Sequence, residues 1–134
     1  MSEKALRKRV CKMLRHHHAV PVENRVGPGT PDVNCTLGWI ELKKMRRWPI
    51  NAEDSFVLIH HYTAQQRQWH RLRAAAGERT FLLLQVGPQW LLFTGPALQL
   101  VGAMTKGRML RDAHRAWDSA PSAADLVSAL GSRA

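Results

Sequence analysis

The sequence has few cysteines, no long apolar run and a shortage of acidic residues. Its two cysteines, Cys11 and Cys35, are isolated and lack the CxxC spacing of zinc sites, so we expect neither a zinc site nor a disulfide framework. No apolar stretch approaches the roughly 18 residues needed to cross a bilayer, and the N-terminus lacks a secretory apolar region. We therefore expect a cytoplasmic protein that is not secreted and has no membrane partner.

The shortage of acidic residues leaves the chain strongly basic. Its 134 residues include 20 Lys and Arg against 10 Asp and Glu, which gives a net charge of +10. Such a charge creates a positive field that favours a polyanion, although many small basic proteins merely carry a solvated basic surface. The length fits one domain that can bury a sizeable core without a metal or disulfide. The composition therefore favours a small globular protein with a nucleic-acid partner.

The order of the apolar patterns predicts an α/β domain. Helical spacing over residues 3–16 is followed by a strand near 19–23 and by two antiparallel strands joined tightly near Leu37–Gly38. A helix at 63–76 precedes a hairpin of two apolar strands at 79–86 and 89–93, turned by Gly87–Pro88. We expect a mixed central sheet flanked by helices, with residues 97–134 as a basic C-terminal helical extension packed on the same single domain.

The second helix and the connection before it carry further expectations. The spacing of Trp69, Leu72 and Ala76 predicts the apolar face of the helix, so we interpret Trp69 as a core residue. The histidines here lack HxH or HExxH spacing, so we expect surface or supporting residues at His60, His61 and His70. The connection at 45–62 is long enough to be functional, and its apolar residues or those of the C-terminal helices would suit a dimer interface.

One constellation carries chemistry: Asp32, eight intervening residues, and then Glu41-Leu42-Lys43. Glu41 and Lys43 lie two apart on a strand and so project from one face. If the hairpin brings Asp32 alongside, two carboxylates could bind Mg²⁺, and Lys43 could orient a water or neutralise charge developing on phosphorus. The alternative is a solvated strand edge with a weak cross-strand pair.

A further carboxylate begins the first helix. Glu3 shares the stripe of Leu6 and Val10 and so points towards the body of the domain. The alternative is that Glu3 only complements the positive end of the helix dipole.

These residues resemble a known nuclease family. GTPD–x8–ELK, at 29–32 and 41–43, resembles the bipartite signature of the PD-(D/E)xK nuclease superfamily. The segment YTAQQRQWHRLRAAAG, at 62–77, resembles the virus-type replication-repair (VRR) nucleases and Holliday-junction-resolvase-like endonucleases. The resemblance implies a restriction-endonuclease-like α-β-β-β-α-β core within residues 1–96 and hydrolysis of DNA with Mg²⁺ or Mn²⁺. It is compatible with a phage or other viral origin.

The resemblance also implies residue roles. Asp32 and Glu41 match the metal ligands of the family, and Lys43 matches its catalytic lysine. Glu3 matches the acidic residue that many relatives place on the first helix, as a further metal ligand and catalytic residue, with Glu23 as the competing candidate.

The second helix supplies one further catalytic candidate. Gln66 matches the glutamine that the family places beside the metal, or Gln65 does if the alignment slips by one residue. Thr63 and Gln66 also fit a capping box, in which both side chains merely satisfy the helix N-terminus.

Basic residues near the motif are candidates for DNA contacts: Lys44, Arg46, Arg47, Arg25 and Arg7. Trp48 could stack on an unpaired base. We expect a structure-specific endonuclease acting on branched, Holliday-junction-like DNA as a homodimer, because paired incisions need two sites. The alternatives are a nuclease acting on duplex or flap DNA, and a non-catalytic basic protein that binds DNA or RNA.

Overall fold

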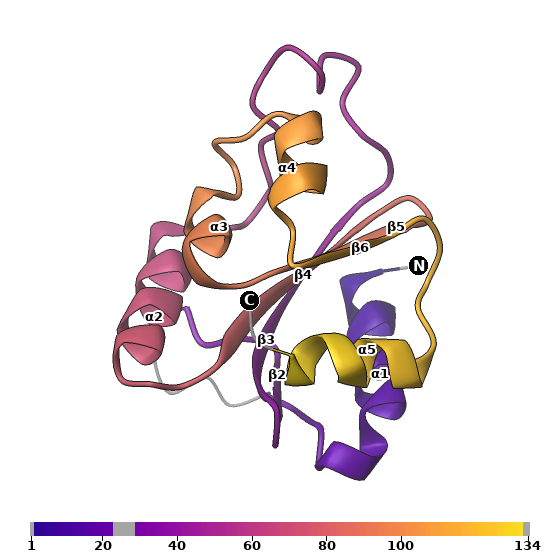
Figure 1. Cartoon of the computed structure of the whole chain (residues 1–134), viewed down its shortest axis with the longest axis vertical. Coiled ribbons are helices and arrows are strands. Elements are labelled where there is room, and N and C mark those ends of the chain that lie inside the picture. The colour runs from indigo at the N-terminus through magenta and orange to yellow at the C-terminus, as the bar shows by residue number, and fades with distance from the viewer. Residues whose placement is uncertain (1, 23–28, 133–134) are drawn as a thin grey trace.

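The computed structural model describes residues 2–22 and 29–132, which form a mixed sheet with helices on both faces (Figure 1). The helices are α1 (Glu3–Met13), a 3-10 turn η1 (Arg15–His17), α2 (Ala64–Ala75), α3 (Gly95–Leu100), α4 (Lys106–Asp112) and α5 (Ala123–Gly131). The strands are β1 (Val20–Pro21), β2 (Val33–Cys35), β3 (Gly38–Met45), β4 (Thr80–Val86), β5 (Gln89–Phe93) and β6 (Arg115–Trp117).

The six strands lie in sequence order, β1 to β6, across one sheet. β3 and β4 run parallel and are connected through α2, whereas every other neighbouring pair is antiparallel. The expected mixed sheet flanked by helices is therefore confirmed, and the chain follows the order helix, three strands, helix, strand up to β4. The tight turn at Leu37–Gly38 is also as expected, with Gly38 at φ 139°.

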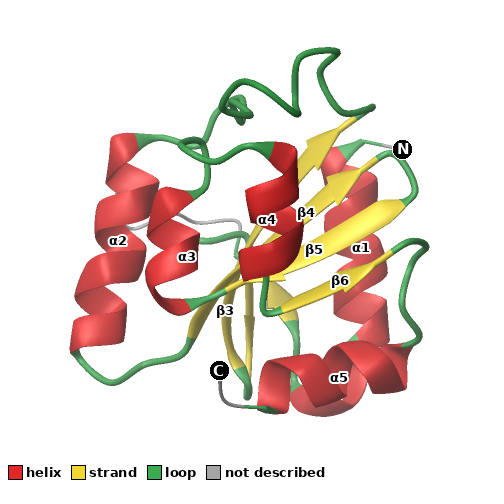
Figure 2. Ribbon diagram, turned by 45° about the horizontal axis from the view of Figure 1, so that its top comes forward, coloured by secondary structure: helices red, strands yellow, loops and turns green. Residues whose placement is uncertain are grey.

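Two apolar clusters hold the helices on opposite faces of the sheet (Figure 2). α1 and α5 cover one face, where Leu6 and Leu126 pack with Phe81 and Leu83. α3 and α4 cover the other face with α2 beside them, and residues such as Leu82 of β4 join this second cluster. β4 alternates between the clusters and is buried on both faces, as expected for a central strand with a parallel neighbour.

β3 is buried on both faces, although only one face is apolar. Ile40 and Leu42 belong to the cluster under α1 and α5. Glu41 and Lys43 alternate with them and so face the opposite side, where they are only 1% and 4% exposed. The sequence correctly predicts the alternation, whereas the burial of its polar side depends on the chain that crosses over that face.

The C-terminal segment 97–134 is not helical throughout. α3 begins before it, at Gly95, and β6 within it pairs with β5 at the sheet edge, with Trp117 opposite Trp90. α5 packs on the same face as α1. The segment therefore completes the sheet and one of its layers. No helix in the described part of the chain is both long and apolar enough to cross a membrane.

The inward face of α2 differs from the expected one. Leu72 is 58% exposed and Trp69 is half-buried, whereas the buried residues are Gln66 and His70, one helical turn apart. Trp69 lies at the edge of this buried face and packs edge-on against Trp39 of β3, with 5.0 Å between ring centroids. Of the two positions expected for His70, surface or supporting, the surface position is excluded, since that side chain is 1% exposed.

Burial makes His70 a source of acid sensitivity. Neither ring nitrogen has a hydrogen-bond partner among the described residues, and burial lowers the pKa of His70 from 6.5 to about 4. The fold therefore favours the neutral ring. The contribution of this preference to the unfolding free energy is complete above pH 6.5 and is lost as the pH falls towards 4. A shift of this size corresponds to about 3 kcal/mol of unfolding free energy.

We predict that His70→Leu removes this part of the acid sensitivity. Urea unfolding at pH 7 and at pH 4.5 should show a smaller drop in unfolding free energy for the variant than for the wild type. The difference between the two drops in unfolding free energy leaves out the contribution of the other titrating groups, which both proteins share. It also leaves out any effect of the substitution on packing that does not depend on pH. Equal drops in both proteins would show that His70 is not the buried neutral group described here.

Candidate functional site

A hydrogen bond joins the two halves of the sequence motif. Oδ2 of Asp32 accepts from the backbone N–H of Leu42 at 2.9 Å, and Leu42 lies between Glu41 and Lys43. Asp32 directly precedes β2, in which Val33 pairs with Ile40. Continuing this antiparallel register by one residue sets Asp32 opposite Glu41. The structure therefore brings the Asp32 backbone and the Glu41 strand into the proximity that the spacing predicts.

Lys43 has a defined partner beneath the surface. Its Nζ donates to the backbone carbonyl of His61 at 2.6 Å. An ammonium has three N–H donors, so one such bond does not exhaust its capacity. His61 itself has a positive φ of 61°, which is uncommon outside glycine and is found more often at functional sites.

Glu41 lies beside Tyr62, the residue before the α2 cap. Burial raises the pKa of the Tyr62 hydroxyl well above its usual value, and the Glu41 carboxylate raises it further against the opposing effect of Arg67. The Tyr62 hydroxyl donates to the carbonyl of Leu98 at 3.2 Å. Burying a carboxylate and an ammonium two residues apart on one strand costs free energy, which makes this pair unusual for a purely structural role.

Glu3 and Asp32 line one cavity of about 240 Å³, together with Lys4, Arg7 and Leu42. Ser2 caps α1 by accepting from the N–H of Ala5 at 3.1 Å, so Glu3 falls in the first turn. Glu3 is exposed; it stands at the positive end of the helix and borders the space next to Asp32, so its role stays a prediction. Its competitor, Glu23, lies outside the described residues.

The carboxylates suit a hard divalent cation. Among residues 2–22 and 29–132, no three His, Cys, Asp or Glu side chains cluster closely enough to hold a metal ion. Mg²⁺, however, is usually held by one or two carboxylates and completes its shell with waters and substrate phosphates. Asp32 with Glu41 or Glu3 fits that requirement in ligand type, since all three offer only oxygen.

Gln66 forms the expected capping box at the start of α2. Its Oε1 accepts from the N–H of Thr63 at 2.9 Å, and its own N–H donates to Thr63 Oγ1 at 3.1 Å. The capping role is therefore present, and a catalytic role for Gln66 stays a prediction. Gln65, the alternative, is exposed.

Gly29 fixes the GTPD segment against the same helix end. It has a φ of +86°, and a Cβ built on it would clash with the backbone carbonyl of Gln65. The backbones therefore touch at a point that only glycine allows. This contact holds the residues leading to Asp32 beside the start of α2.

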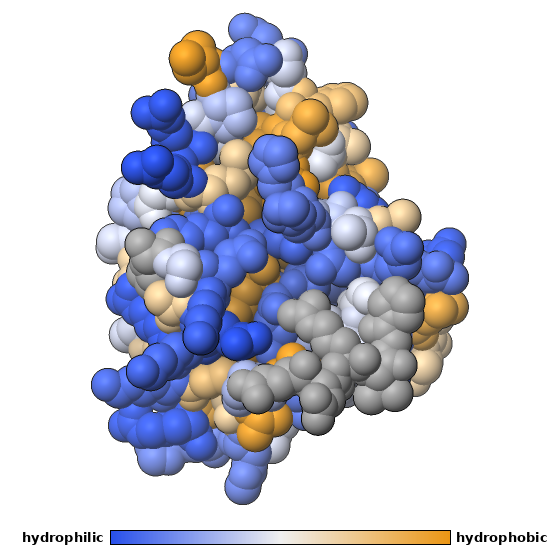
Figure 3. Space-filling view, turned by 180° about the vertical axis from the view of Figure 1, so that it is seen from behind, coloured by the Kyte–Doolittle hydropathy of each residue, from blue (hydrophilic) through white to orange (hydrophobic). Residues whose placement is uncertain are grey.

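The basic candidates differ in exposure. Arg46 and Arg47 are exposed, Lys44 and Arg7 are half-buried, and Arg25 lies outside the described residues. Seen from behind, the molecule carries a broad band of hydrophilic side chains (Figure 3).

Trp48 is engaged within the protein rather than displayed for stacking. Its Nε1 donates to Oε1 of Gln89 at 2.6 Å, and the Lys106 ammonium lies 5.2 Å from its ring centroid.

The sequence did not indicate the His61 carbonyl as the partner of Lys43, because a backbone group leaves no side-chain signal. Sequence reasoning likewise gave no role to Tyr62, which entered only as the first residue of the YTAQQ segment.

No protein family matches this chain in a comparison with known families, and neither a curated protein nor a solved structure matches it. The likeness to PD-(D/E)xK nucleases therefore depends on the residues of the motif.

The Gly29 contact leads to a prediction with a matched control. Gly29→Ala should lower the unfolding free energy by about 2 kcal/mol or more, because it adds a backbone clash to the strain of a positive φ. Gly77→Ala is the control, since Gly77 has nearly the same φ, +87°, and nothing within 4 Å of an added Cβ. Urea unfolding of both variants measures the difference. Equal losses of unfolding free energy in the two variants would contradict the close approach of the Gly29 backbone to Gln65 of α2.

Proposed function

We propose that this chain is a metal-dependent DNA endonuclease that hydrolyses phosphodiester bonds. The observation that carries the proposal is the 2.9 Å hydrogen bond from Leu42 N–H to Asp32, which ties one acidic residue to the backbone between Glu41 and Lys43. A buried acid and base beside a further carboxylate form a costly arrangement that a solvated strand edge would not need. The PD-(D/E)xK resemblance assigns the same three residues to catalysis.

The side chains have complementary roles in this proposal. Asp32 and Glu41 would hold Mg²⁺ or Mn²⁺, with Glu3 as a further carboxylate at the adjoining cavity. The bound ion would polarise the scissile phosphate and lower the pKa of an attacking water. Lys43, held by the His61 carbonyl, would direct an N–H towards the phosphate and neutralise the charge that develops on it.

Branched DNA is the proposed substrate, and a homodimer the proposed assembly. The net charge of +10 supports a polyanionic partner, and Arg7 borders the cavity that Asp32 lines. A chain of this size offers one such site, whereas paired cuts in opposing strands need two, which a symmetric dimer would supply. Flap or duplex DNA would be cut by the same chemistry.

A second candidate function is nucleic-acid binding without cleavage. The burial of Glu41 and Lys43, at 1% and 4% exposure, favours it, because catalysis requires a metal ion to reach Glu41 and a phosphate to reach Lys43. This candidate predicts strongly salt-dependent binding that is unaffected by divalent metal.

We predict that Asp32→Asn abolishes cleavage and preserves the fold. The amide oxygen can still accept from Leu42 N–H, whereas the charge needed to hold a cation is lost. We expect a loss of about a hundredfold or more in cleavage rate with Mg²⁺, and DNA affinity within about threefold of the wild type. Asp125→Asn, an exposed position on α5, is the charge-matched control and should cleave normally. Undiminished cleavage by Asp32→Asn would contradict the proposal.

A second pair of variants separates the two candidates for the remaining carboxylate. Because Glu3 lines the cavity next to Asp32, Glu3→Gln should reduce the cleavage rate by about tenfold or more, whereas Glu23→Gln should leave it nearly unchanged. Rates are measured on one labelled DNA over a range of Mg²⁺ concentrations, since a lost ligand raises the concentration required. The reverse order of effects would assign the role to Glu23.

A further inference from the structure

Apolar side chains stand exposed on the 46–62 connection between β3 and α2. Ile50, Phe56 and Leu58 are exposed by 105%, 62% and 73%, whereas Val20 and Leu72 lie singly on separate elements. Hydrophobic side chains also appear at the upper end of the molecule in Figure 3, the end that the connection occupies in Figure 1. Grouped, exposed apolar side chains of this kind often mark a binding surface.

The connection is anchored to the rest of the fold rather than loose. Ala52 and Val57 are buried in the second apolar cluster, at 3% and 0% exposure. Val57 N–H donates to the carbonyl of Met104 at 2.8 Å, and the N–H of Lys106 donates to the carbonyl of Ala52 at 2.9 Å. Phe56 and Leu58 flank the buried Val57, so the backbone that carries these two exposed side chains is held in place by Val57.

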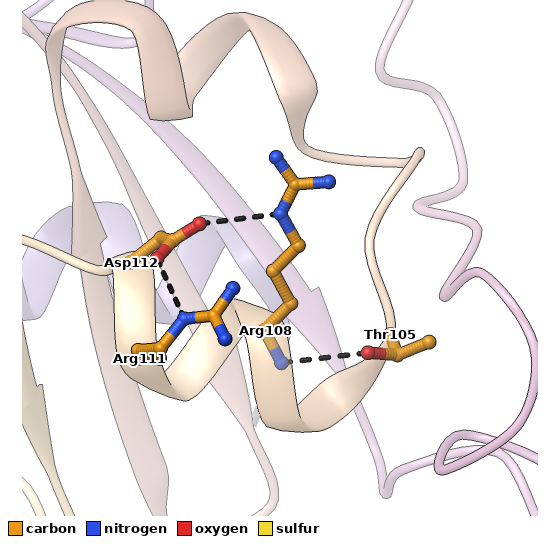
Figure 4. A network of polar contacts seen from close by, with 4 residues as sticks. All are labelled: Thr105, Arg108, Arg111 and Asp112. Atoms are coloured by element: carbon orange, nitrogen blue, oxygen red, sulfur yellow. Dashed lines mark hydrogen bonds and ion pairs between the residues drawn. The ribbon is translucent and has the colours of Figure 1, made fainter.

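Basic side chains outnumber acidic ones on this connection and α4 taken together. Arg46 and Arg47 precede Ile50 in the chain, and the acidic Glu53 and Asp54 lie between Ile50 and Phe56. α4 begins at Lys106, whose N–H donates to the carbonyl of Ala52. On α4, the Nε atoms of Arg108 and Arg111 each donate to the Asp112 carboxylate at 3.2 Å. Figure 4 shows the terminal nitrogens of both guanidinium groups directed away from that carboxylate. Asp112 thus orients two arginines whose remaining donors suit phosphate oxygens.

The charge pattern decides between a second copy of this chain and a nucleic acid. Two copies meeting through this surface would bring net positive charges together, because Arg46, Arg47, Lys106, Arg108 and Arg111 outnumber Glu53, Asp54 and Asp112. Glu53 is also 3.9 Å from Lys106. DNA offers negative phosphates together with apolar base faces, and these faces become accessible where bases are unstacked. The connection also leads from the end of β3 to His61, which holds Lys43, so a ligand here would lie near the proposed catalytic strand.

We propose that Phe56 and Leu58 form a wedge that contacts unstacked bases at a DNA branch point. The flanking phosphates are held by Arg46, Arg47, Arg108 and Arg111. This inference rests on the proposed function, because it takes the substrate to be DNA, and it adds the feature that distinguishes branched DNA from an intact duplex.

The test measures binding in EDTA, where cleavage does not occur. The probes are a four-way junction with 2-aminopurine at the branch point and a linear duplex of the same arm sequence. Wild-type protein should increase the 2-aminopurine fluorescence, which reports unstacking. The double variant Phe56→Ser/Leu58→Ser should lose this response and bind the junction about tenfold more weakly, with duplex affinity within about twofold. Leu72→Ser, a similarly exposed residue on α2, is the control and should behave as the wild type.

Several outcomes would overturn the wedge. These are an absent fluorescence response in the wild type, equal losses of junction and duplex affinity in the double variant, and a switch from dimer to monomer in light scattering with junction binding intact. The last would assign the surface to a second copy of the chain. Cleavage in Mg²⁺ is scored separately. Cleavage without the fluorescence response refutes the wedge alone, whereas the response without cleavage supports the wedge and refutes the nuclease.

Discussion

The hydrogen bond between Leu42 N–H and the Asp32 carboxylate, at 2.9 Å, is the constraint on which the site depends. β2 has only three residues, so its pairing with β3 extends no further than Val33 opposite Ile40. Beyond that point a side-chain oxygen, instead of a strand carbonyl, satisfies the backbone donor of Leu42. The same contact fixes the position of a carboxylate beside the strand that carries Glu41. The same hydrogen bond therefore lies where the β2–β3 pairing ends and holds the Asp32 carboxylate beside the strand that carries Glu41.

Several polar and ionisable side chains are buried near this contact, beside the apolar residues of the sheet. The apolar side chains of β4 and β5 are buried, and they contribute to the hydrophobic free energy of the domain together with those of the flanking helices. Glu41, Lys43 and His70 oppose it, because each places a polar or ionisable group at 4% exposure or less. Their neighbours compensate in part, as the His61 carbonyl does for Lys43. Such a conflict between stability and side-chain chemistry is typical of a functional site.

Much of the fold could be predicted because its signals are local. Alternation along β3, apolar runs in β4 and β5, and the Thr63–Gln66 capping box all follow from residue spacing. The inward face of α2 could not be predicted, since it is the polar Gln66 and His70 that are buried there, and apolar spacing does not indicate them. β6 has three residues, too few to show alternation within a basic segment. Within the site, spacing indicated the acidic and basic side chains, whereas the partner of Lys43 is a backbone carbonyl and the close approach of Gly29 to α2 is tertiary.

The central claim is that the motif cleaves DNA with the help of a divalent cation. The most direct measurement incubates the wild-type protein with an end-labelled four-way junction, a flap and a linear duplex, first in EDTA and then after addition of excess Mg²⁺ or Mn²⁺. The account predicts no cleavage in EDTA and strand cutting that begins only when metal is added, with the junction cut fastest. Stable binding to all three DNAs, with no cutting in either metal, would contradict it and leave the chain a nucleic-acid-binding protein.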